Sequence, residues 1–138
     1  MTNELRDFYP ERRKASRHRV SLFSSVSLIE PPYETEALNT GPAVSAITEN
    51  ISLEGLLLVV ARSNYIRRAD LSEPDRLLRI VINLPLGESG VVEMVAKIRQ
   101  PARVSKGTLK LGYLVGLQIH EMSAPHRALY NEYISTLP

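Results

Sequence analysis

Apolar and polar residues alternate along most of the chain with a period of two, which is typical of strands that bury one face. In residues 76–85, for example, aliphatic side chains alternate with Arg79 and Asn83. The pattern predicts six strands, in segments 20–30, 43–50, 55–61, 76–85, 91–100 and 109–120. Turn-forming residues separate these segments, which favours short antiparallel strands in a barrel or a sandwich.

The last segment of the chain has helical spacing instead. Ser123 is a suitable N-cap, and Pro125 falls in the first turn, where proline is tolerated. The apolar stripe of this helix consists of Tyr130, Tyr133, Ile134 and Leu137. We expect the stripe to pack on the sheet or to cover a barrel end, and a face for a partner protein is the alternative. A single helical turn is also expected within residues 63–76.

Length and composition favour one domain with one core. The chain has 138 residues, of which 43% are apolar, and it contains no cysteine, which excludes disulfides and thiolate sites. We expect a flexible segment at residues 1–10 and one domain over residues 11–138. The N-terminus has no apolar leader, and no run approaches the ~18 apolar residues of a membrane span. A cytoplasmic protein without membrane insertion is therefore expected.

Positive charge is concentrated near the N-terminus. The formal net charge is +2, from 17 basic and 15 acidic residues. Residues 11–19, "ERRKASRHR", hold five of the basic residues and one acid, so the remainder is slightly acidic. Most of the basic residues are arginine, whose planar guanidinium pairs with phosphate and guanine and stacks on flat rings. The cluster predicts a local anionic ligand rather than a nucleic-acid surface spread over the domain.

The sequence offers little for catalysis or metal binding. None of the three histidines, His18, His120 and His126, has a nucleophile or a metal-ligating partner at a suitable spacing. No nucleophile elbow, zinc-binding helix or phosphate-binding glycine loop is present. We therefore do not expect an enzyme, a metal site or a resident cofactor.

The stretch "ENISLEGLLL" lies where one expected strand ends and the next begins. One interpretation of Asn50, Ser52 and Gly55 is an ordinary tight turn, in which Gly55 takes a positive φ angle. A functional interpretation is a rigid polar ledge that contacts the edge of a nucleic base. The turn taken alone leaves both interpretations open.

Together the two stretches resemble the PilZ domain family. The R-x-x-x-R motif at Arg13 and Arg17 precedes the first strand, and an N-x-S-x-x-G motif follows at Asn50, Ser52 and Gly55. "RIVINLPLG", "YLVGLQI" with its central Gly116, and the final helix extend the resemblance over residues 11–136. The resemblance implies a six-stranded antiparallel β-barrel with a C-terminal helix.

The resemblance also implies a ligand, the bacterial second messenger cyclic dimeric GMP (cyclic-di-GMP). Arg13 and Arg17 would bind its phosphates and guanine faces. The further arginine at position 12, Arg12, implies that two mutually stacked ligand molecules bind. The rim under a guanine would be formed by Asn50, Ser52 and Gly55. The chain departs from the common pattern at His18 and Arg19, where the family usually has hydrophobic residues or proline, and it has Asn50 where many members have aspartate.

A receptor of this kind would signal to an effector protein that the sequence does not identify. We expect the segment from Met1 to Arg19 to be loose without ligand and to close over the site when ligand binds. One alternative is an adaptor that acts by protein contact alone, with the arginines forming a solvated tail. Another is a small barrel that binds single-stranded nucleic acid by stacking bases on aromatic side chains. The chain has only two Phe and no Trp for such stacking, so no nucleic-acid partner is expected.

Overall fold

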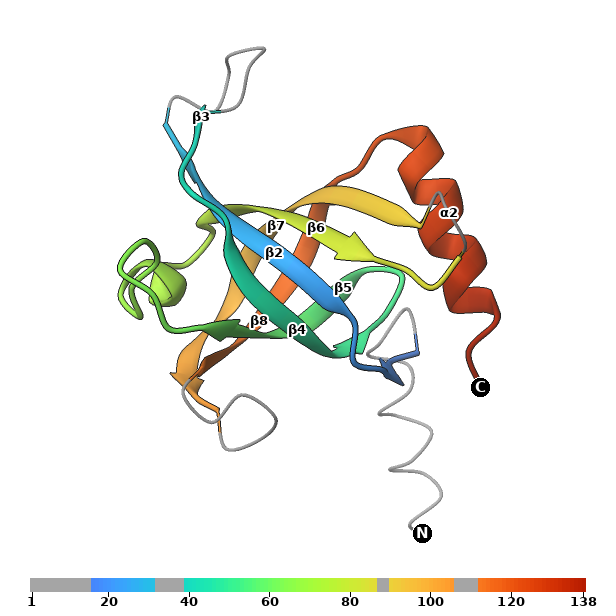
Figure 1. Ribbon diagram of the computed structural model, residues 1–138, viewed down its shortest axis with the longest axis horizontal. Coiled ribbons are helices and arrows are strands. Elements are labelled where there is room, and N and C mark those ends of the chain that lie inside the picture. The colour runs from blue at the N-terminus through green and yellow to red at the C-terminus, as the bar shows by residue number, and fades with distance from the viewer. Residues whose placement is uncertain (1–15, 32–38, 87–89, 106–111) are drawn as a thin grey trace, which may run out of the picture.

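The fold is a closed antiparallel β-barrel with a C-terminal helix (Figure 1). The computed structural model describes residues 16–31, 39–86, 90–105 and 112–138. The barrel strands are β2 (Phe23–Glu30), β4 (Val44–Ile51), β5 (Gly55–Ala61), β6 (Leu77–Asn83), β7 (Val91–Val104) and β8 (Gly112–Glu121). Their order is β4-β5-β8-β7-β6-β2, and pairing of β2 with β4 closes the ring. The expected six-stranded barrel is confirmed.

Two short strands extend the barrel edges. Strand β1 (His18–Arg19) pairs with the end of β4, and β3 (Asn39–Thr40) pairs with the end of β2. The strand expected over 20–30 begins only at Phe23, because residues 20–22 connect β1 to β2. The expected turns at 87–90 and 105–108 fall largely outside the described residues.

Alternation along each strand fills the barrel. The inward residues of β6, for example, are Leu78, Ile80 and Ile82, and none of them is exposed to solvent. The matching inward residues of β7 are Val92, Met94, Ala96 and Ile98. Because cross-strand partners share a face, the antiparallel register brings these two rows together inside the barrel. Arg79 and Glu93 pair with each other on the outer side.

Strand β7 continues four residues beyond the expected segment, through Pro101. The ladder between β7 and β8 shifts register between Gln100 and Arg103. Proline lacks an N–H group and is tolerated in a strand where the ladder is interrupted. The long strand is thus compatible with the proline.

The two ends of the barrel are covered by different elements, which lie on opposite sides in Figure 1. Helix α2 (Ala124–Ser135) buries Tyr130, Tyr133 and Ile134 against the core at one end, as its stripe predicts. The connection between β5 and β6 buries Ile66 and Leu71 at the other end. It contains one helical turn, η1 (Asp70–Ser72), which is the turn expected there. Among the described residues, no helix is long and apolar enough to cross a lipid bilayer.

Candidate functional site

The N-x-S-x-x-G motif forms a tight turn between β4 and β5. The Ser52 hydroxyl accepts hydrogen bonds from the amides of Gly55 (3.1 Å) and Glu54 (3.3 Å). It donates to the carbonyl oxygen of Gly55 (3.2 Å), which also accepts from the Ser52 amide (2.8 Å). Ser52 is 7% exposed. Its side chain therefore holds the shape of the turn, as the tight-turn interpretation predicts.

Gly55 is required by a close approach between strands. It pairs with Gln118 of β8, and a Cβ atom built on Gly55 would lie 2.5 Å from the carbonyl oxygen of Leu117. The φ angle of Gly55 is not positive, so the expectation of a left-handed conformation there is wrong. Glycine is needed because no side chain fits against the neighbouring backbone.

A β-bulge decides which way Asn50 faces. The register of β4 against β5 shifts between Thr48, which opposes Leu58, and Asn50, which opposes Leu57. Thr48 and Leu58 are inward and fully buried, whereas Leu57 lies outside the core. Strict alternation from Thr48 would turn Asn50 inward, but the extra residue at Glu49 places it on the outer wall. Asn50 is half buried, and its side-chain amide makes no hydrogen bond to a described residue.

Helix α2 holds the turn through two hydrogen bonds that the sequence did not reveal. The Tyr130 hydroxyl donates to the carbonyl oxygen of Ser52 (2.7 Å), and Arg127 Nη1 donates to that of Leu53 (2.8 Å). Burial raises the pKa of Tyr130 well above its ordinary value, although the nearby Arg127 opposes this, so the phenol stays protonated and can donate. The helical spacing predicts that Tyr130 lies on the apolar face of the helix, but spacing does not reveal the partner of a hydroxyl.

The chain that carries the arginines is pinned to β4 just beyond them. The buried Thr48 hydroxyl accepts from the Leu22 amide (2.8 Å) and donates to the Val20 carbonyl oxygen (2.6 Å). Strand β1 then pairs His18 with Ile51 and Arg19 with Asn50. Arg17 directly precedes β1, so it lies next to the end of β4, where the Asn50–Gly55 turn begins.

The arginines of this edge are available for a ligand. Arg17 and Arg19 are exposed, and neither forms an ion pair with a described residue. Arg12 and Arg13 lie outside the described residues. His18 is held through its ring, in which Nδ1 donates to the carbonyl oxygen of Pro138 (3.0 Å). Within the segment expected to be loose up to Arg19, the structure pairs His18 and Arg19 with β4, and the looseness of the residues before them stays a prediction.

The described part of the chain shows no metal centre. No three His, Asp or Glu side chains gather there as they would around a metal ion. The acidic residues nearest to the site in sequence are Glu49, which belongs to β4, and Glu54, which lies in the turn itself. The arrangement consists of exposed guanidinium groups beside a backbone turn and an amide. Such groups bind an anion that also carries hydrogen-bonding rings.

Comparison with known proteins identifies the family. The sequence matches the PilZ domain over residues 11–136, which is nearly the whole chain. The protein belongs to the PilZ domain family. No curated protein matches the sequence.

Solved structures share the fold at low sequence identity. The PilZ domain of YcgR from Escherichia coli, solved with c-di-GMP, has a TM-score of 0.54 and 14% identity, with 90% of each chain covered. The inhibitor of motility MotI/DgrA of Bacillus subtilis gives 0.60 and 20%, and covers 91% of this chain. MrkH, described as a c-di-GMP-dependent transcription regulatory factor, gives 0.61 and 14%, with 91% of this chain covered. The chain spans 50% of the length of MotI/DgrA and of MrkH.

The close approach at Gly55 predicts a stability effect. Gly55→Ala should lower the free energy of unfolding by roughly 1–3 kcal/mol, because the added methyl group collides with the Leu117 carbonyl. Thermal unfolding followed by circular dichroism measures this. Gly41→Ala is the matched control, since a Cβ there meets nothing within 4 Å. Equal melting temperatures for the two variants would contradict the packing described.

The Tyr130 hydroxyl gives a second prediction. Tyr130→Phe should cost about 1–3 kcal/mol of unfolding free energy, because it leaves the Ser52 carbonyl without its buried donor. Tyr133→Phe is the control, since the Tyr133 hydroxyl bonds no described residue although the ring is equally part of the core. Denaturant unfolding of both variants tests the difference, and a Tyr133→Phe cost as large as that of Tyr130→Phe would refute the assigned role.

Proposed function

We propose that the protein is a receptor module that binds cyclic-di-GMP at the edge of the barrel formed by β1 and the Asn50–Gly55 turn. The pairing of β1 with β4 carries this proposal. It brings Arg17 of the first family motif to the strand end that holds the second motif. Two stretches more than thirty residues apart in the sequence thereby become one surface.

The chemistry of this surface suits a cyclic dinucleotide. Arg13 and Arg17 supply planar guanidinium groups, which bind phosphate oxygens in pairs and stack on purine rings. The outward Asn50 amide can both donate to and accept from a guanine edge. Ser52, whose hydroxyl is engaged with the turn backbone, contributes by holding the turn in place. Gly55 contributes by allowing the turn to lie close to β8.

The known ligand of a structural relative supports the same assignment. YcgR was solved with c-di-GMP bound to a PilZ domain of similar extent. Arg12, directly before the first motif arginine, favours two stacked ligand molecules, whose phosphates would be shared among more guanidinium groups. No resident cofactor and no catalytic step are part of the proposal.

The receptor would act through a partner protein. The described residues form one barrel with a helix, and the ligand site uses the arginine segment together with the turn. We infer that ligand orders residues 11–17 over the barrel edge and so changes the surface offered to an effector protein. Neither an inserted membrane segment nor a nucleic-acid partner is part of this function.

Arginine variants test the ligand site. Arg13→Ala and Arg17→Ala should each weaken cyclic-di-GMP binding by roughly 1.5–3 kcal/mol, the range for a lost hydrogen bond to a charged group. Asn50→Ala should also reduce affinity. Calorimetry gives affinity and stoichiometry together, and Lys14→Ala is the control that should change little. If the wild type does not bind, an adaptor that acts by protein contact alone replaces the proposal.

Hydrogen exchange tests the ordering of the arginine segment. Amides of residues 11–17 should exchange quickly in the free protein and become protected with cyclic-di-GMP, because phosphate contacts offset the entropy of ordering. The Leu22 amide is the internal control, since its bond to the buried Thr48 hydroxyl should protect it in both states. Equal protection of residues 11–17 with and without ligand would indicate a preformed site.

A further inference from the structure

An uncharged groove lies on the outer wall of the barrel beside the candidate site. Its volume is about 320 Å³, within the range of small-molecule sites. It crosses the neighbouring strands β2, β4 and β6, and its principal lining side chains are Phe23, Ser25, Ser45, Ile47, Val81 and Asn83. None of the residues that line it carries a charge. The groove therefore suits a neutral, flat group with polar edges better than a phosphate.

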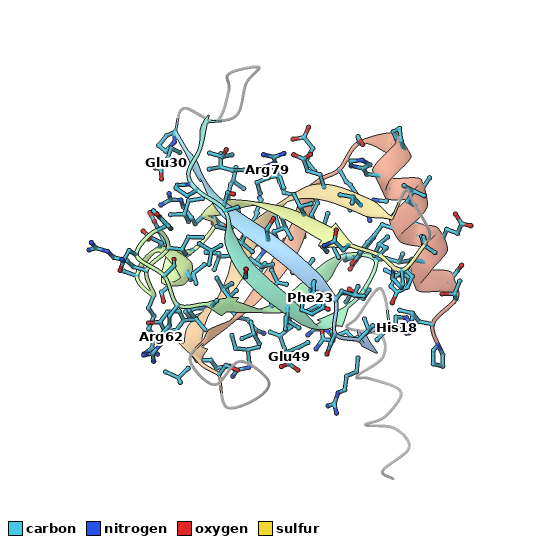
Figure 2. All side chains as sticks on the ribbon, viewed as in Figure 1. His18, Phe23, Glu30, Glu49, Arg62 and Arg79 are labelled. Carbon is cyan, nitrogen blue, oxygen red and sulfur yellow. The ribbon has the colours of Figure 1, made fainter. Side chains whose placement is uncertain are left out.

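Phe23 is the most exposed large apolar side chain among the described residues, at 75%. A single exposed aromatic residue is common on protein surfaces and carries no meaning by itself. Phe23 differs because it lines a groove together with the polar residues Ser25, Ser45 and Asn83. Figure 2 shows Phe23 at the start of β2.

The strand register connects this groove to the candidate site. Phe23 opposes Ile47 on β4, and Arg19 opposes Asn50 on the same edge of the same strand. Cross-strand partners share a face, so Phe23 and Asn50 both lie on the outer wall. Ile47 and Asn50 are three residues apart, which is about 10 Å at the rise of a strand. The groove therefore begins about 10 Å along β4 from the position where Arg19 pairs with Asn50.

We propose that this groove binds a purine base of the ligand, with the base stacked on Phe23 and its edge facing Asn83, Ser25 and Ser45. This inference rests on the proposed function and extends it with a base site that lies outside both sequence motifs. The arginines hold the phosphates at the edge of β4, and the uncharged groove accepts one ring of the same ligand. An aromatic side chain that stacks on a base gains binding energy with little loss of conformational freedom.

A partner protein that covers Phe23 is the competing occupant. The groove lies next to the strand end where β1 pairs with β4, which favours the ligand, because a base tethered to a phosphate at Arg17 reaches the groove without a second molecule. The absence of charged residues in the groove also fits a neutral base between charged phosphate contacts.

The lack of tryptophan in the chain permits a direct spectroscopic test. Phe23→Trp introduces the only indole, and stacking on a guanine should quench its fluorescence as cyclic-di-GMP is added. Quenching should saturate over the same concentration range as binding of the wild type measured by calorimetry. Tyr65→Trp is the matched control, because Tyr65 is 61% exposed on the β5–β6 connection at the other end of the barrel. Its fluorescence should not respond.

Phe23→Ala provides the second measurement. It should weaken cyclic-di-GMP binding at least about fivefold, at the low end of the effect of a lost aromatic stack, and Tyr65→Ala should not. If the wild type binds but Phe23→Ala binds equally well and the indole at position 23 is not quenched, the groove is not a base site, and the receptor function stands without it. If the wild type itself fails to bind, the proposed function fails and this inference falls with it.

Discussion

Strand β2 pairs along both edges, with β4 on one side and β6 on the other, and this double pairing closes the barrel. Closure removes exposed sheet edges and makes one face of every strand an interior. It also divides the molecule into a core that consists mainly of aliphatic side chains and an outer wall that faces solvent. The candidate site depends on this division, because Arg17, Asn50 and the turn that follows Asn50 lie on the wall or at its edge.

The turn at the centre of the site is held from several directions. The Ser52 hydroxyl bonds to the turn itself, the Ile119 amide donates to the Glu54 carbonyl oxygen (2.8 Å), and Tyr130 and Arg127 donate from the helix. The turn is thus held from within itself, from β8 and from the helix. In the function we propose, the conformational change lies in residues 11–17, because the chain that follows them is tied to Thr48 of β4 through Val20 and Leu22.

The helix acquires a second role from the same contacts. It covers one end of the barrel, and through Tyr130 it is joined to the backbone of the turn that the ligand would touch. Strand β1 lies close to the end of the same chain, as the His18–Pro138 contact shows. Strand β1, the turn and the helix are therefore contiguous in the structure.

The sequence by itself determined the strands, the helix and the two motifs. Alternation marked the inward rows of β6 and β7, the Ser123 cap and Pro125 marked the start of α2, and the paired motifs indicated the family. These signals are local, because each depends on spacing within one element or one turn. Local signals of this kind could not show that Gly55 is needed for its approach to Leu117, or that the bulge at Glu49 turns Asn50 outward. They also could not show that Tyr130 bonds to Ser52, or that Phe23 borders a groove. Each of these depends on the register between strands distant in sequence, and only closure of the barrel fixes that register.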